Sequence, residues 1–361
     1  MSKVISIGTA LPRHRHAQTD ILQFMQTLYC ETDAERRKLR FLYGQSGIGQ
    51  RYSVVPDFSR PVAEWKFFPQ TEGLTPFPTI EQRLAVYNKY APQLSIAAIR
   101  DCIEGIASPQ EITHLITVSC TGMSAPGLDL QVAEAMGLNK NIFRTSVNFM
   151  GCYAAIHGLK LAHALVAADA AAKVVVVCTE LCTLHLQREA TADNMASALL
   201  FGDGAAAALV VHDSHSHNGV VVDGFYSEII TKGKEDMAWE ISATGFLMTL
   251  SSYVPQLIEA DFASVTDRVL SAQGKQAADV SHWCIHPGGR RILDGIQKSM
   301  CLSSSALQPS YEVLQEVGNL SSATILFVLK KIMAGKESIP KLLGAAFGPG
   351  LTVETFTAHR A

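Results

Sequence analysis

Three side chains with complementary chemistry occupy similar places in the sequence: a thiol, an imidazole and a carboxamide. Cys152 follows Gly151 where a small-residue helix pattern begins, and Asn319 follows Gly318 at a similar point. His286 ends the short run HWCIH and precedes Pro-Gly-Gly, which leaves the imidazole at the end of a strand. A helix N-terminus stabilises a thiolate, and an adjacent imidazolium lowers the thiol pKa further. We therefore predict a nucleophile with two hydrogen-bond donors for an oxyanion or enolate.

The elements that must position these residues alternate between strands and helices. The runs 112–120 and 173–180 are short, apolar and β-branched, as in strands buried on both faces, and 205–212 is a third such run. The segment 154–168 has the composition of a buried helix, with Ala and Gly permitting close packing. This alternation predicts a layered α/β fold.

The second half of the chain repeats the pattern of the first half. His114 and His282 head similar runs 168 residues apart, and Cys152 and Asn319 are 167 residues apart. At the same spacing, VVVVCTE matches KLLGAAFG. The order of these elements predicts a duplicated fold in which Cys152 and Asn319 face one another across a central cleft.

A polar stretch, HDSHSHNG at 212–219, is suited to join the two halves. We therefore divide the chain into 1–218, which carries the cysteine, and 219–361, which carries the histidine and asparagine. The histidines of this stretch lack a strand or helix that would fix them as metal ligands, so we predict no metal site there. Asp203 in FGDG is interpreted as a turn former that bonds its neighbouring backbone.

Composition excludes several classes of function. The net charge of −3 gives no basic surplus for nucleic acid. The long apolar runs are interrupted by charges, so no membrane span is expected, and the N-terminus lacks the apolar core of a signal peptide. The eight cysteines follow neither a disulfide framework nor a zinc-binding spacing. They favour a reducing cytoplasm.

Five motifs in order carry a family resemblance: NFMGCYAAIHGLKLA, LLFGDGAAAALVV, CIHPGGRRIL, GNLSSATILFVL and FGPGLTVET. They resemble the type III polyketide synthases, the chalcone- and stilbene-synthase-like branch of the thiolase superfamily, in a bacterial-type variant. The resemblance implies an α/β thiolase-like fold with a duplicated five-layered αβαβα core, and a homodimer. It also implies an acyltransferase in which Cys152 carries the acyl chain of an acyl-CoA starter. His286 and Asn319 then promote decarboxylation of malonyl-CoA and condensation, and no cofactor beyond the CoA thioesters is required.

The resemblance extends to the substrate pocket. Phe201 matches the gatekeeper phenylalanine between the CoA tunnel and the elongation cavity, and Ser321 matches a small polar position near the nucleophile. Three positions differ from the plant pattern: Met248 replaces a second gatekeeper phenylalanine, Trp239 a glycine and His185 a threonine. Methionine is flexible and could admit an aliphatic chain, whereas the tryptophan would fill or redirect the cavity. These changes argue against an aromatic starter of the naringenin type.

Recognition of CoA also departs from the plant pattern. Of three basic residues near the tunnel mouth, only Lys38 is kept. Arg290 and Arg291 follow the loop that contains Gly288 and Gly289, and we expect this segment to bind CoA, with the guanidinium groups on its phosphates. The alternative interpretation is a solvated helix start.

Other condensing enzymes remain as alternatives. A ketoacyl-carrier-protein synthase III has the same three residues but condenses once, with carrier-bound malonate. HMG-CoA synthase needs a general-base glutamate that the sequence does not place. A thiolase needs a second cysteine, for which Cys284 is a weak candidate. A non-catalytic homologue would have lost the cysteine, which is present. The starter, the number of extensions and the cyclisation mode are left open.

Overall fold

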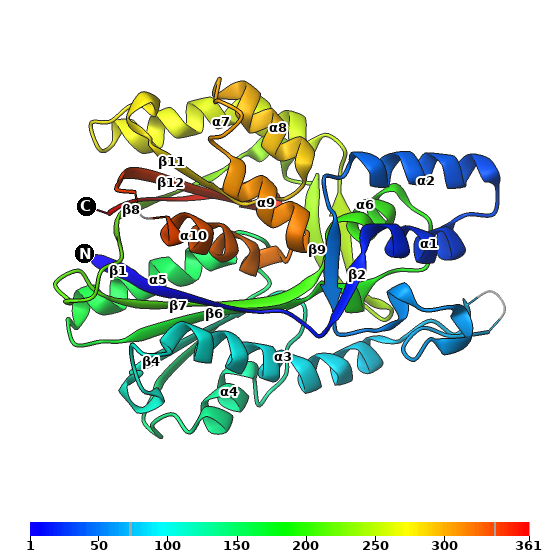
Figure 1. Cartoon of the computed structure of the whole chain (residues 1–361), viewed down its shortest axis with the longest axis horizontal. Helices are drawn as coiled ribbons and strands as arrows, with labels where there is room; N and C mark the ends of the chain where they lie inside the picture. Colours follow the sequence, from blue (N-terminus) through cyan, green and yellow to red (C-terminus); the bar gives the residue numbers. More distant parts are fainter. Residues whose placement is uncertain (72–73, 336, 361) are drawn as a thin grey trace.

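The computed structural model describes residues 1–71, 74–335 and 337–360. Its elements stack in five layers that alternate between helices and strands (Figure 1). The outer helices are α7 (Val254–Ser271) and α8 (Arg290–Ser299) on one side, and α3 (Ile80–Ile103) and α4 (Leu128–Met136) on the other. Between the two strand layers lie α5 (Ala154–Ala168) and α10 (Thr324–Ala334). This is the predicted αβαβα arrangement.

The strands of both layers join through backbone hydrogen bonds. They are β1 (Ser2–Ala10), β4 (His114–Ser119), β5 (Phe143–Asn148), β6 (Val174–Leu181), β7 (Asp203–His212), β8 (Val220–Ile229), β11 (His282–Ile285), β12 (Ile339–Gly348) and β13 (Thr352–Arg360). Their order is β11-β12-β13-β8-β1-β7-β6-β4-β5. The β1–β8 pairing connects the strands of the first half to those of the second.

The two halves pair their equivalent strands in the same register. In the parallel pair β4–β6, His114 lies opposite Val174. In the parallel pair β11–β12, His282 lies opposite Leu342. Both members of the second pair are 168 residues further along the chain, which is the offset of the sequence repeat. The register therefore supports a duplicated core.

Alternate residues of each inner strand face different helix layers. In β6, Val175 packs in the cluster that contains α3, whereas Val176 packs against α5. In β12, Leu343 packs with α7 and α8, whereas Leu342 faces the central layer. Burial on both faces explains why these strands are continuous apolar runs.

A cap of shorter elements covers one end of the layers, at the right of Figure 1. Within the described residues, no helix is long and apolar enough to cross a membrane. The cap and the helix before the Asn319 loop comprise α1 (Gln18–Tyr29), α2 (Asp33–Gln45), β2 (His14–Ala17), β3 (Gln50–Ser53), α6 (Ala192–Leu200), β9 (Met237–Ser242), β10 (Gly245–Leu250) and α9 (Gln308–Val317).

Candidate active site

A tight turn between β5 and α5 presents Cys152. Gly151 has φ +79°, and a Cβ added to it would lie 2.3 Å from Cδ of Pro349, so only glycine fits. The Gly151 N–H donates to Sγ of Cys120 at 3.0 Å. Cys152 is therefore fixed just before the first turn of α5.

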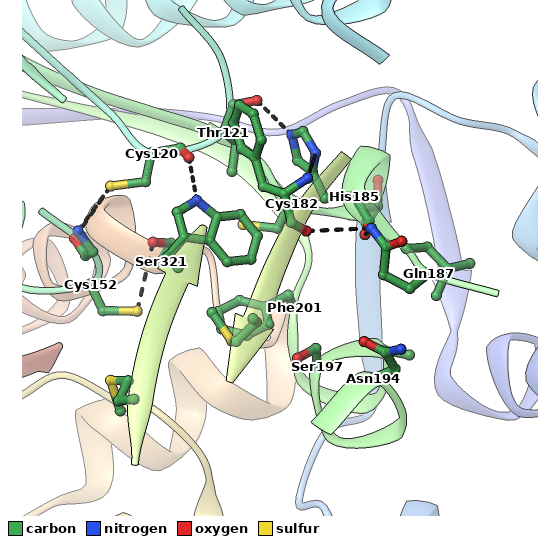
Figure 2. A pocket seen from close by; sticks show the side chains of 18 of the residues that line it. Cys120, Thr121, Cys152, Cys182, His185, Gln187, Asn194, Ser197, Phe201 and Ser321 are labelled. Atoms are coloured by element: carbon green, nitrogen blue, oxygen red, sulfur yellow. Dashed lines mark hydrogen bonds between the residues drawn. The ribbon is translucent and has the colours of Figure 1, made fainter. Parts of the chain in front are cut away.

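Asn319 connects the thiol to the loop that carries the predicted histidine. Its Nδ2 donates to the carbonyl of Gly288 at 3.3 Å, and the side chain lies close enough to the Cys152 thiol to lower the pKa of the thiol. Its Oδ1 accepts the Ser321 N–H at 2.8 Å. The thiol itself donates to Ser321 Oγ at 3.6 Å (Figure 2). The structure thus brings the predicted nucleophile close to the predicted carboxamide.

His286 follows β11 and is 1% exposed. Its backbone N–H donates to the carbonyl of Ala345, but both ring nitrogens are buried without a partner in the part of the chain that the structure describes. Burial lowers the pKa of the imidazole to about 3, so the ring is neutral. Because an unpaired buried polar group is costly, the ring is suited to a partner that the substrate supplies.

The thiol is not a preformed thiolate. Burial raises the pKa of Cys152 to about 12, although the neighbouring side chains of Ser321 and Asn319 lower it. The expectation of a depressed pKa was therefore wrong for the free site. Cys152 is only 9% exposed, and the neutral His286 provides no positive charge that would offset the burial of the thiol.

A buried carboxyl group, Glu180 in β6, lies near the predicted nucleophile, Cys152. It accepts hydrogen bonds from the Cys120 N–H at 3.0 Å, from the Thr121 hydroxyl at 2.8 Å and from the Ser322 hydroxyl. Burial raises its pKa to about 7. We missed this residue in the sequence, although a charged residue inside the apolar run VVVVCTE was a usable signal.

A pocket opens beside Cys152, with an empty volume of about 820 Å³, part of it open to solvent. The predicted pocket residues line it together with Cys152, while His286 and Asn319 lie outside its lining. The lining includes the predicted Phe201, Met248, Ser321, His185 and Trp239, and the unpredicted Met25, Arg51, Phe58, Cys120, Cys182, Leu186, Asn194, Ser197, Ala198 and Phe246. No pattern in the sequence linked the unpredicted residues to the site.

Asp203 does not act as the predicted local turn former. Its carboxyl group accepts the Thr183 N–H at 2.8 Å, the Thr183 hydroxyl at 2.7 Å and the Val54 N–H at 2.9 Å. Burial raises its pKa to about 6. The residue ties together three distant segments beside Phe201, because a fully buried carboxyl group requires such partners.

The predicted CoA-binding residues separate into two places. Lys38 is exposed on α2, and a Cβ added to Gly47, just beyond α2, would lie 3.2 Å from Cδ of Arg290. Arg290 therefore packs against the end of α2. Arg291 instead lines a pocket between α7 and α8. Gly289 lies close to α6, where an added Cβ would be 3.3 Å from Leu200.

Comparisons with known proteins give one family over nearly the whole chain. The model of the N-terminal domain of chalcone and stilbene synthases matches residues 1–214, and that of the C-terminal domain matches 225–360. The alpha-pyrone synthesis polyketide synthase-like Pks18 of Mycobacterium tuberculosis is 29% identical over 356 residues, covering 96% of this chain and 88% of that protein. The 1,3,6,8-tetrahydroxynaphthalene synthase of Streptomyces peucetius is 29% identical, covering 98% and 92%. The crystal structure of PKS-I from the brown alga Ectocarpus siliculosus has a TM-score of 0.92 at 27% identity, covering 100% and 98%.

Proposed function

The chain belongs to the chalcone and stilbene synthases, the type III polyketide synthases, and from this premise we propose how its residues perform the reaction. An acyl-CoA starter is loaded on Cys152 and extended by decarboxylative Claisen condensation with malonyl-CoA. The chain is then released or cyclised. The single-condensation, HMG-CoA synthase, thiolase and non-catalytic alternatives are not favoured by the family assignment.

Loading begins with two neutral groups. His286 takes the thiol proton of Cys152, and the thiolate attacks the thioester carbonyl of the starter. The carbon–sulfur bond to CoA breaks, and the imidazolium returns its proton to the departing CoA thiolate. Burial raises the pKa of Cys152 and lowers that of His286, which disfavours a resting ion pair and opposes the transfer in the free site, so we place the proton transfer in the substrate-bound site.

Extension needs donors for an enolate. Malonyl-CoA binds with its thioester carbonyl at His286 and Asn319, carbon dioxide leaves, and the two N–H groups stabilise the enolate oxygen. The enolate carbon attacks the acyl-cysteine and frees the Cys152 thiolate. The Ser321 N–H holds Oδ1 of Asn319 at 2.8 Å, which directs the NH₂ group toward the His286 loop.

The observation that carries this proposal is the series of contacts that joins Cys152 to the loop of His286. The thiol donates to the Ser321 hydroxyl at 3.6 Å, the Ser321 N–H donates to Oδ1 of Asn319 at 2.8 Å, and Nδ2 of Asn319 donates to the carbonyl of Gly288 at 3.3 Å. The test is product mass spectrometry with isotope-labelled malonyl-CoA and a panel of acyl-CoA starters. Products heavier than the starter by several labelled two-carbon units support the proposal, and Cys152→Ala should abolish them. A single two-carbon addition would instead indicate ketoacyl synthase III chemistry.

Binding of CoA is assigned to the junction of α2 and α8. Lys38 and Arg290 supply positive charge there, and Gly288 and Gly289 leave the loop without side chains beside His286. The placement of Arg291 against α7 favours Arg290 as the phosphate contact. No further cofactor is proposed. Among the described residues, no group of three or more His, Cys, Asp or Glu is arranged to hold a metal ion.

A homodimer is supported by the sheet edge at β5. Phe143 on this strand is 63% exposed, and Leu161 on the adjacent α5 is 37% exposed. An edge strand with unpaired backbone groups and exposed apolar side chains is suited to a second copy of the chain. Sedimentation of the wild type and of Phe143→Arg tests this, because the substitution should favour the monomer.

The proposal also assigns a domain boundary and a cellular compartment. The chain divides into halves 1–218 and 219–361, with the boundary in the connector between β7 and β8. The enzyme acts in a reducing cytoplasm, since all eight cysteines are free thiols.

A further inference from the structure

One side of the active-site pocket is closed by three rings. His185 and Phe246 stack with centroids 4.2 Å apart and 6° between their planes. Trp239 meets both rings edge-on, at 5.8 Å from each. His185 and Phe246 are 5% and 2% exposed, so this side is a packed wall with little freedom to move.

The polar atoms of this wall already have partners. The Trp239 indole N–H donates to the carbonyl of Cys120 at 2.6 Å. Nε2 of His185 hydrogen-bonds to the carbonyl of Thr121 at 2.7 Å, and its Nδ1 accepts the Phe246 N–H at 3.1 Å. The wall therefore offers no free donor to a hydroxyl group on an aromatic starter.

The pocket continues in the other direction, along α6. Figure 2 shows Cys152 and Ser321 on one side of the view and Asn194 and Ser197 on the other, with Phe201 between them. Opposite the nucleophile, the amide of Asn194 donates to the carbonyl of Glu189 at 2.9 Å. The Ser197 hydroxyl donates to the carbonyl of Asp193 at 2.8 Å. Asn194 thus donates to the segment that precedes α6, and Ser197 donates to the backbone of α6 itself.

Much of the remaining lining is apolar, although Arg51, whose Nη2 is buried without a partner among the described residues, also lines the pocket. Met25 of α1, Phe58, Leu186 and Ala198 of α6 are each less than 9% exposed and line the same pocket. The thioether chain of methionine adapts its rotamers to a flexible guest. Burying each methylene of such a guest against this surface contributes about 0.8 kcal/mol.

From these observations we propose that the acyl chain of the starter lies along α6, between Met25, Phe58, Leu186 and Ala198, and that the starter class is an aliphatic acyl-CoA. This inference rests on the proposed function, since it requires the starter to be esterified to Cys152. It assigns the ring wall of Trp239, His185 and Phe246 the role of excluding the chain from the opposite side.

The test combines starters of different acyl-chain length with substitutions that narrow the pocket beside α6. Ala198→Leu should lower kcat/KM for decanoyl-CoA relative to acetyl-CoA by at least about tenfold, because a pocket methylene alone changes specificity to that extent. Ala196→Leu, on the same helix but outside the pocket lining, is the matched control and should leave the ratio unchanged. Ser197→Leu provides a second obstruction if Ala198→Leu does not fold.

The wild-type enzyme should also load decanoyl-CoA on Cys152 faster than a hydroxycinnamoyl-CoA. The inference would be overturned if kcat/KM fell equally for all chain lengths in Ala198→Leu and Ser197→Leu. It would also be overturned if the wild type preferred the hydroxycinnamoyl thioester. Both results would leave the proposed function standing. Failure of every starter to acylate Cys152 would instead contradict the proposed function itself.

Discussion

The Cys152 thiol donates a hydrogen bond to the hydroxyl of Ser321, with 3.6 Å between Sγ and Oγ. After deprotonation the same hydroxyl can rotate and donate to the thiolate, which is why this contact lowers the pKa of Cys152 while burial raises it. Ser321 has φ +48°, a backbone conformation that costs free energy for any residue except glycine. The site retains this strained residue beside the nucleophile.

Replacing Ser321 by glycine should therefore slow formation of the thiolate. We expect alkylation of Cys152 by iodoacetamide to rise with pH through pH 9 in the wild type. In Ser321→Gly it should be about tenfold slower at each pH, from the loss of a hydrogen bond to a charged group. Peptide mass spectrometry measures the rate at Cys152 alone. Glycine relieves the positive φ, so thermal unfolding serves as the control for folding. An unchanged rate would show that Ser321 does not act on the thiolate.

Asn319→Ala should separate loading from extension. Removal of one donor to a developing oxyanion typically costs about 100- to 1000-fold, so release of labelled carbon dioxide from malonyl-CoA should fall by that factor. Acylation of Cys152 should fall much less, because His286 remains as the base. Quenched-flow measurement of both steps makes the comparison. Equal loss of both steps would contradict the assignment of Asn319 to the enolate.

Glu180 should make stability depend on pH. Its pKa is raised from 4.5 to about 7 in the folded protein, so between these values the folded state binds more protons than the unfolded state. Stability from this group is therefore lost as pH rises from about 4.5 to about 7. The variant Glu180→Gln lacks this loss, so its free energy of unfolding relative to the wild type should increase by about 3 kcal/mol between pH 4.5 and pH 8.

Urea unfolding at several pH values measures this difference. The exposed Glu104→Gln is the matched control and should show no such trend. The effect of other buried carboxyl groups, such as Asp203, is common to all three proteins and cancels. A difference between wild type and Glu180→Gln that stays constant with pH would show that Glu180 is ionised throughout.

Charge reversal should distinguish the two arginines after the HPGG loop. Arg290 packs against Gly47 at the end of α2, whereas Arg291 faces α7. Arg290→Glu should raise KM for malonyl-CoA by about tenfold, the effect of one charge-assisted contact. Arg291→Glu is the matched control and should leave KM within a factor of about two. Steady-state kinetics at constant ionic strength test this; similar changes in both variants would place the phosphates elsewhere.

Local patterns predicted much of the fold. The segment 154–168 is helical over that range, and the repeat offset reappears in the register of β4–β6 and β11–β12. These features were readable because periodicity and burial on both faces of a strand leave a direct trace in residue order. The cysteine turn was readable for the same reason, since Gly151 allows a backbone conformation that other residues avoid.

Burial that results from tertiary packing could not be predicted from local sequence patterns. The position of Cys152 at a helix start suggested a depressed pKa, but the depth of the site raises it instead. Met25 and Phe58 reach the pocket from segments far from Cys152 in sequence, so no local spacing linked them to it. Asp203 sits in a turn-like motif, yet its hydrogen bonds go to Thr183 and Val54. Each of these features depends on which elements pack together.

The central claim is that Cys152 carries the acyl chain, and the pocket contains two further thiols, Cys120 and Cys182, that could compete for it. The most direct measurement is proteolysis and mass spectrometry of the enzyme after brief exposure to an acyl-CoA starter without malonyl-CoA. We predict the acyl mass on the peptide of Cys152 alone, and its loss in Cys152→Ala. An acyl group on Cys120 or Cys182, or persistence of the adduct in Cys152→Ala, would contradict the account.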